Sequence, residues 1–192
     1  MKRSTFALCA AFVTALPLAA AAADPAAPPA ATQPAPPPLV YDDPAMHFAA
    51  PADWEGIRIP PVPDEEAQHT VAFFVKDRGE STQRTIGIDI GPFSGTLDDL
   101  VSVQESELRK QYEGAFIDRK ARVLLANGMP AWWLRVSYGT DLGRMYERYE
   151  YIVFDGRRGI VASHTAHRGE AQEKDARAAL GTLSVVLYPR GR

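Results

Sequence analysis

The stretch RKARVLLANGMPAWWLRVSYGTDLGRMYERYEYIVFDGRRGIVASHTAH, residues 119–167, decides the fold. It consists of runs rich in aromatic and β-branched residues, which favour strands. Asn127-Gly128 and Asp155-Gly156 separate these runs, and such pairs are typical of tight turns between antiparallel strands. The stretch therefore predicts a meander of four antiparallel strands, at residues 119–125, 131–140, 144–154 and 159–167.

Two further strands are expected upstream of this meander. His69–Lys76 and Gln83–Ile90 are rich in β-branched and aromatic residues, and residues 77–80 between them have the composition of a hairpin turn. Ile86, Ile88 and Ile90 alternate with smaller or polar residues, which predicts a strand with one buried face.

Two segments have helical rather than strand periodicity. Thr96 followed by Asp99 resembles a capping box, and apolar residues then recur at helical spacing until Gly114. A second helix is expected at about 170–183, where Glu170 and Glu173 suit the positive end of the helix dipole. Each helix has one apolar stripe, so each should pack on the sheet. The predicted fold class is α+β, a twisted antiparallel β-sheet flanked by helices.

The N-terminal part of the sequence predicts export. Lys2 and Arg3 precede an apolar run, and Ala21–Ala23 offers a cleavage site for a signal peptide at residues 1–23. The apolar run is short for a bilayer span, which needs about 20 residues, so cleavage is favoured over a retained membrane anchor. Residues 24–38 carry seven prolines among alanines and are expected to form an extended, disordered linker. Residues 39–192 have the length of one ordinary domain.

Composition limits the chemistry of the exported chain. Its one cysteine, Cys9, lies in the predicted signal peptide, which excludes disulfides, thiolate catalysis and cysteine-ligated metals from the exported part. Removal of the signal peptide takes two positive charges and no negative ones, so the net charge changes from −3 to −5. A mildly acidic chain without a basic run is a poor candidate for binding nucleic acid.

The order of motifs resembles a known superfamily. Tyr41, Pro44, Phe48, Pro51 and Trp54 form an opening Y-x-x-P…F-x-x-P-x-x-W pattern. A hairpin, a Leu-Asp-Asp-Leu helix, an Asn-Gly-Met-Pro-Ala-Trp segment and a closing helix follow. This order resembles the PsbP-like superfamily, which includes the photosystem II extrinsic protein and DcrB-like bacterial envelope proteins, over about Tyr41–Tyr188. The resemblance implies an α/β/α sandwich in a family of small accessory or binding proteins rather than enzymes.

No catalytic or cofactor motif is found in the sequence. It has no G-x-S-x-G nucleophile elbow, no phosphate-binding loop and no H-E-x-x-H pattern. His164, His167 and Glu170 form the one combination with some metal-ligand spacing. Residues three apart on a strand point to opposite faces, however. We therefore expect no catalytic residue, no cofactor and no metal site, with a site at His164, His167 and Glu170 as the less favoured alternative.

The strand expected at 144–154 carries the best candidates for binding a partner. Alternation places Met145, Glu147, Tyr149 and Tyr151 on one face and Tyr146, Arg148, Glu150 and Ile152 on the other. Tyrosine and arginine are common among the residues that dominate protein interfaces. The predicted partner-binding residues are therefore Tyr146, Arg148, Tyr149, Glu150 and Tyr151, together with Trp133. The alternative is that these side chains serve the fold, for example through a cross-strand ion pair between Arg135 and Glu147.

Two functional classes remain open from the sequence. The first is an exported, non-enzymatic accessory protein of the bacterial cell envelope, in the periplasm or secreted, that binds an envelope protein. The second is a periplasmic carrier of a small molecule, lipid or metal, held in a pocket between sheet and helix. After cleavage of the signal peptide no transmembrane segment is expected. The identity of the partner and the oligomeric state stay undetermined by the sequence.

Overall fold

The computed structural model describes residues 39–57, 59, 69–112, 114–140, 143–170 and 172–188. The predicted signal peptide and linker, residues 1–38, lie outside the described residues. The described elements, in chain order, are β1 (Val40–Asp43), β2 (Met46–Ala49), β3 (Glu55–Ile57), β4 (His69–Lys76), β5 (Arg84–Pro92), α1 (Leu97–Gln111), β6 (Phe116–Leu124), β7 (Pro130–Gly139), β8 (Met145–Phe154), β9 (Arg158–His167), α2 (Glu173–Ala179) and β10 (Ser184–Val185).

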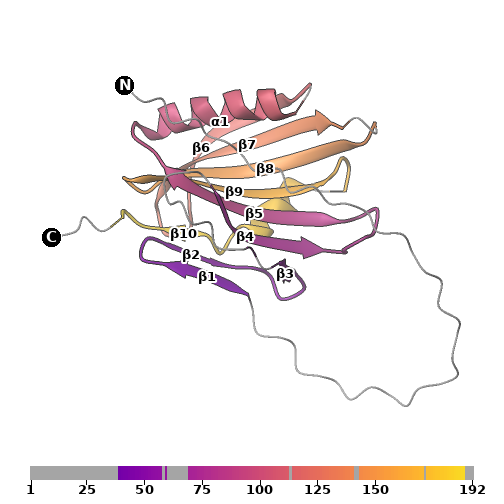
Figure 1. The fold of residues 1–192 in the computed structure, drawn as a ribbon, viewed down its shortest axis with the longest axis horizontal. Coiled ribbons are helices and arrows are strands. Elements are labelled where there is room, and N and C mark those ends of the chain that lie inside the picture. The colour runs from indigo at the N-terminus through magenta and orange to yellow at the C-terminus, as the bar shows by residue number, and fades with distance from the viewer. Residues whose placement is uncertain are drawn as a thin grey trace, which may run out of the picture.

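Seven strands form one large antiparallel sheet in the order β3-β4-β5-β9-β8-β7-β6 (Figure 1). The predicted meander is confirmed, because β6, β7, β8 and β9 pair as consecutive neighbours. Gly128, in the turn between β6 and β7, has a φ of 84°, a left-handed conformation that favours glycine. The left-handed backbone conformation of this turn therefore explains why the sequence has Asn-Gly here.

Three short strands form a second sheet in the order β1-β2-β10. In this sheet β2 pairs on one side with β1 and on the other with β10, so it joins the two ends of the described chain. Met46, Phe48 and Val185 of this small sheet are buried in the same apolar cluster as Ile86 and Trp133 of the large sheet. The small sheet therefore packs on one face of the large one.

Helix α1 covers the other face of the large sheet (Figure 1). Its start is the predicted capping box: Thr96 Oγ1 accepts a hydrogen bond from the Asp99 backbone N–H, and Asp99 accepts one from the Thr96 N–H. Leu100, Val101 and Leu108 form its buried stripe. A Cβ atom on Gly159 would lie 2.7 Å from the Leu100 side chain, so glycine at this position of β9 lets the helix approach the sheet closely.

Helix α2 packs beside the small sheet, on the face opposite α1. It is shorter than predicted, because it begins at Glu173 rather than Glu170 and ends at Ala179. Ala176, Ala179 and Leu180 bury its apolar side against the cluster around Trp133. The fold is therefore α+β, with α1, the large sheet, and α2 with the small sheet as three successive layers. Neither described helix is long and apolar enough to cross a bilayer.

Candidate functional site

The residues predicted to bind a partner lie in the middle of the fold. Strand β8 is flanked by β7 and β9, and most of its side chains are buried in the two layers that cover the sheet. Trp133, Tyr149 and Glu150 expose no more than 1 % of their surface, and Arg148 and Tyr151 are also buried. Tyr146 is half-buried. Five of the six predicted residues therefore offer little exposed surface to a partner, and their assignment as contact residues stays a prediction.

Under α1, the charges of β8 are satisfied inside the protein. Arg148 Nε donates a hydrogen bond of 2.6 Å to Glu150 Oε1, and Gln104 Nε2 of α1 donates to both Glu150 oxygens at 3.2 Å. Burial alone would lower the pKa of Arg148, but the negative charge of Glu150 keeps it raised above its usual value. Arg148 and Glu150 thus form a buried ion pair that connects β8 to helix α1.

A second buried carboxyl lies near this pair, on β5. Burial raises the pKa of Asp89, although the hydrogen bond from Thr70 Oγ1 at 2.5 Å and the positive charge of Arg148 both act to lower it. A carboxyl with a raised pKa is a candidate proton donor when it faces a cleft. Here Asp89 is buried and bonded to Thr70, so its contacts are those of a structural group.

The two histidines with metal-ligand spacing point to opposite faces of the sheet. The His164 ring lies 5.7 Å from that of Trp54, in the layer of α2 and the small sheet. The His167 ring lies 4.4 Å from that of Tyr146, which packs against the cluster under α1. Within the described part of the chain no three His, Cys, Asp or Glu side chains are placed to hold a metal ion. The His164 and His167 rings therefore do not converge.

An exposed surface lies on the α2 side of the sheet, at the end where β8 begins. We call it the arginine patch and define it as Phe116, Arg119, Arg135, Met145 and Arg168. Strand pairing brings these residues together, because Phe116 lies opposite Ser137, Arg119 opposite Arg135 and Met145 opposite Gly139. Arg168 follows β9 directly, and its backbone N–H bonds to the Met145 carbonyl.

Glu147 lies at the base of the arginine patch. Arg135 Nη2 donates to Glu147 Oε1 at 2.9 Å, which confirms the predicted cross-strand pair, and this bond raises the pKa of Arg135. Tyr149 also donates to Glu147, through its hydroxyl at 3.1 Å, and Arg168 Nε lies 4.0 Å from the same carboxylate. Glu147 therefore holds one side of the patch in place.

Sequence reasoning found only part of the arginine patch. It paired Arg135 with Glu147, but it started the first strand of the meander at Arg119 and so left out Phe116. Phe116 and Ile117 belong to β6, and a bulge between Ile117 and Arg119 breaks the alternation there. As a result Asp118 and Arg119 both contact groups of the α2 side, namely Arg135 and Glu173.

A groove lies at the opposite end of β6, beside the first turn of α1. It has a volume of about 760 Å³ and is lined mainly by apolar side chains, among them Leu97, Leu124 and Pro130. Asp98 lies on its rim, where it pairs with Arg122 and accepts a hydrogen bond of 2.9 Å from Trp132 Nε1. This volume is within the range of small-molecule sites, about 300–1,000 Å³.

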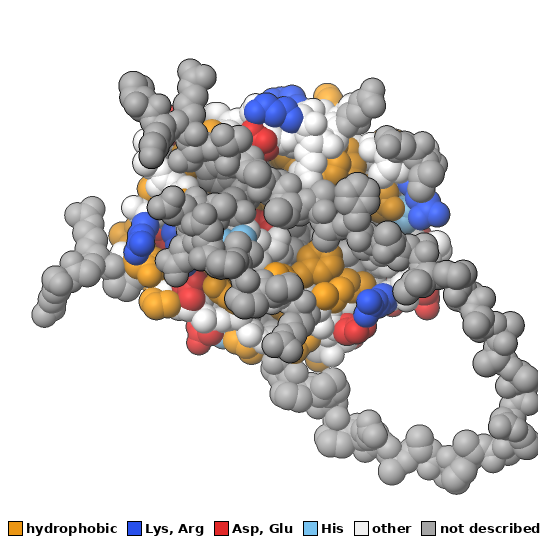
Figure 2. Space-filling view, in the orientation of Figure 1, with side chains coloured by type: hydrophobic (Ala, Val, Ile, Leu, Met, Phe, Trp, Pro, Cys, Tyr) orange, Lys and Arg blue, Asp and Glu red, His pale blue; other side chains and the backbone are white. Residues whose placement is uncertain are grey.

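Charges are mixed over the described part of the face drawn in Figure 2. Lysine and arginine side chains are scattered among aspartates and glutamates, and they do not merge into one continuous basic field there. Among the described residues, oppositely charged side chains often pair with each other, such as Lys120 with Glu105. Pairing of this kind leaves little long-range field to attract a polyanion.

No family model and no curated protein sequence matches the chain. Solved structures match its fold. PsbP from the cyanobacterium Synechocystis sp. PCC 6803 is 12 % identical, with a TM-score of 0.53 over 77 % of this chain and 92 % of that protein. LpqN of Mycobacterium tuberculosis, which is involved in cell envelope biogenesis, is 18 % identical, with a TM-score of 0.52 over 77 % of this chain and 89 % of LpqN.

A Pseudomonas aeruginosa protein of unknown function is 15 % identical, with a TM-score of 0.52 over 81 % of this chain and 99 % of that protein. All three likenesses concern the arrangement of the backbone, since the sequence identities are low. The chain therefore has the PsbP-like α+β fold that its order of motifs resembles.

Proposed function

We propose that this chain is an exported, non-enzymatic accessory protein of a bacterial cell envelope, and that it acts by binding a protein partner. Three features support the proposal: the export signal that the sequence predicts, the lack of a catalytic motif in the sequence, and the likeness in fold to LpqN, an envelope biogenesis protein. The protein would work in the periplasm or outside the cell, in the compartment to which a cleaved signal peptide leads.

The observation that carries the partner-binding function is the composition of the arginine patch. Protein interfaces are enriched in aromatic residues, methionine and arginine, and are depleted of lysine. The patch offers Phe116 with 65 % of its surface exposed, Met145 with 41 % exposed, and three arginines without a lysine. Exposed side chains of these types, held together by strand pairing, are the natural anchors for a partner.

The test is affinity purification with crosslinking of the tagged protein from its own cell envelope. Phe116→Glu places a charge in the arginine patch, and Leu124→Glu is its matched control. Both are exposed apolar residues of β6, at 65 % and 68 %, but Leu124 lies at the other end of the strand, in the groove beside α1. We expect one abundant partner that is recovered with Leu124→Glu and lost with Phe116→Glu. Recovery of the same partner with both variants would refute a contact at the patch.

A second candidate function is a carrier of a small apolar molecule, and the groove beside α1 favours it. Its volume of about 760 Å³ and its lining by Leu97, Leu124 and Pro130 suit such a ligand. Native mass spectrometry of the protein purified from its envelope would find a co-purified molecule. That molecule would be absent from Leu124→Glu and present in Phe116→Glu, the reverse of the pattern expected for a protein partner.

A further inference from the structure

We propose that the arginine patch recognises an acidic segment of its protein partner, a segment that carries an apolar side chain among its carboxylates. The inference rests on the proposed function, because it names the chemistry of the element that the partner presents. The inference is based on a difference in solvent exposure between the arginines and the carboxylates at the patch.

Two of the three arginines of the patch, Arg119 and Arg168, are more exposed than the carboxylates that they contact. The Arg168 side chain has 60 % of its surface exposed and Arg119 has 54 %, whereas Glu147 has 6 %. The side chains of the other two carboxylates that contact these arginines, Asp118 and Glu173, have 26 % and 25 % of their surface exposed, against 37 % for Arg135. An approaching partner therefore meets guanidinium groups first, even though acidic and basic residues are present in similar numbers.

The guanidinium groups are held in place before a partner arrives. Arg135 bonds to Glu147, and its Nε lies 3.5 Å from Asp118 Oδ2. Arg119 is bonded to Glu173 of α2. Arginine side chains fixed in this way lose less conformational freedom when they bind, and their planar fork matches a carboxylate. By contrast, the one ion pair of Arg168 among the described residues is the 4.0 Å contact with Glu147, so most of its donors face outward.

The apolar part of the patch lies between these charges. Phe116 is directly opposite Ser137, and Met145 lies across Gly139, where a Cβ atom would be 3.4 Å from the methionine sulfur. The small residues of β7 thus leave the phenylalanine ring and the thioether exposed on either side. Such a pair suits one inserted apolar side chain, with the arginines around it to bind acidic neighbours.

A protein segment fits this surface better than an anionic membrane does. Peripheral membrane proteins combine many apolar and basic side chains over a broad face. Here only two exposed apolar residues stand beside arginines that are held in place, which is a narrow surface rather than a broad one. Arginine forks held in fixed positions favour discrete carboxylates.

The test uses fluorescence anisotropy with the exported protein and three labelled synthetic peptides. The first alternates glutamate and aspartate around a central phenylalanine, the second has lysine in place of every acidic residue, and the third has alanine in place of the phenylalanine. We expect binding of the first peptide only, weakened about tenfold or more by Arg168→Gln. Arg109→Gln, an exposed arginine of α1 on the opposite face, should leave this binding unchanged. A rise in ionic strength from about 0.1 M to about 1 M should also weaken it, since the Debye length falls from about 10 Å to about 3 Å.

Charge reversal gives the decisive comparison. Arg168→Glu should abolish binding of the acidic peptide and improve binding of the lysine peptide, while its melting temperature stays that of the unsubstituted protein. Equal binding of both peptides by all variants would overturn the inference. Binding to vesicles of anionic phospholipid that depends on Arg168, without binding of the acidic peptide, would also overturn it. If a native partner no longer binds the Phe116→Glu variant but still binds the Arg168→Glu variant, the proposed function is supported. The proposal of an acidic segment is then refuted.

Discussion

His164 is a titratable group whose environment opposes its charge. Its side chain is buried on β9 between Trp54 and Tyr149, and its Nδ1 atom has no hydrogen-bond partner among the described residues. Burial lowers the pKa of His164 to about 4 and the positive charge of Arg84 acts in the same direction, while the negative charge of Asp175 and a backbone hydrogen bond act to raise it. The folded protein thus holds this histidine neutral throughout the pH range in which a free histidine takes up a proton.

The first prediction concerns the pH dependence of folding. The pKa of His164 is about 4 in the folded state and about 6.5 in the unfolded state, so between these values the unfolded chain binds more protons. The free energy of unfolding should therefore fall as the pH falls from about 6.5 to about 4, by about 3 kcal/mol from this residue. Urea unfolding across this range would measure it.

His164→Leu is the control for this effect, since it removes the titrating group and keeps an apolar side chain in the core. The variant should lose the part of the pH dependence that belongs to His164 between pH values of about 6.5 and 4. The carboxylates that titrate near the lower limit are the same in both proteins, so they cancel in the comparison. Parallel curves for the two proteins would show that His164 is protonated without penalty in the fold.

At the scale of the elements, β8 is an interior strand of the large sheet, and it has charged side chains buried under α1. Glu150 accepts hydrogen bonds from Arg148 of its own strand and from Gln104 of the helix. Arg148→Met should leave the Glu150 carboxylate buried with Gln104 alone, which destabilises proteins by about 3–5 kcal/mol. Chemical unfolding would measure the loss. Arg148→Met combined with Glu150→Leu should recover most of it, because the unpaired charge is then gone.

The same variants separate a structural role of β8 from a contact role. If Arg148→Met is as stable as the unsubstituted protein but no longer retains a partner, the ion pair is not structural. Arg148 would then be a contact residue, as the sequence predicts. The opposite outcome is that Arg148→Met loses stability, that the double variant Arg148→Met with Glu150→Leu recovers it, and that the double variant still retains the partner. Arg148 would then have a structural role only.

The larger elements could be predicted because their signals are local. The Asn127-Gly128 turn, the strand at β5 and the capping box at Thr96 each depend on residues close in sequence, and each is found where it was expected. The alternating isoleucines predicted one buried face for β5, however, and both of its faces are buried. The short strands could not be predicted. β1, β2 and β10 have two to four residues each, too few for a periodic pattern, and they are strands because they pack together on the large sheet.

The candidate site was harder to predict than the elements, for a related reason. Alternation correctly divided the β8 side chains between two faces, with Glu147 on one and Arg148 on the other. It could not show that α1 covers Arg148 and Glu150, because coverage depends on distant parts of the chain. Nor could it place Phe116 and Arg168 beside Arg135, since a bulge precedes Arg119 and a turn follows β9.

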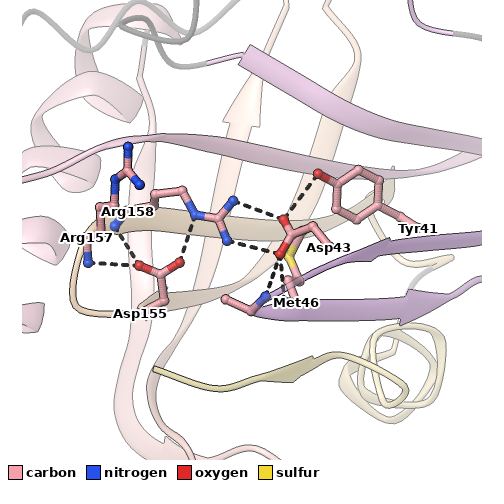
Figure 3. Close-up of polar contacts among 7 residues, drawn as sticks. Tyr41, Asp43, Met46, Asp155, Arg157 and Arg158 are labelled. Carbon is pink, nitrogen blue, oxygen red and sulfur yellow. Dashed lines mark hydrogen bonds and ion pairs between the residues drawn. The ribbon is translucent and has the colours of Figure 1, made fainter. Parts of the chain in front are cut away.

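At the scale of the whole molecule, one arginine connects the two sheets. Figure 3 shows Arg158, the first residue of β9, between Asp155 in the preceding turn and Asp43 at the end of β1. Its Nη1 and Nη2 atoms donate to the two Asp43 oxygens at 3.0 and 3.2 Å, and its Nε donates to Asp155 at 2.8 Å. Burial alone would raise the pKa of Asp43, but the hydrogen bonds from Arg158 and from the Ala45 and Met46 backbone lower it.

Because of this network, the stability of the small sheet should depend on Arg158 of the large sheet. Substitution of Arg158 tests this dependence. Arg158→Met should leave Asp43 and the fully buried Asp155 without their cation, for a loss of about 3–5 kcal/mol in the free energy of unfolding. Arg158→Lys keeps the charge but cannot bond to both carboxylates through a planar fork, so its loss should be intermediate. Hydrogen exchange should then rise in β1 and β2 before it rises in β7 and β8, because the large sheet keeps its own strand pairing. Uniform acceleration over both sheets would mean instead that the two sheets unfold as one cooperative unit, with Arg158 stabilising the whole rather than the contact between its layers.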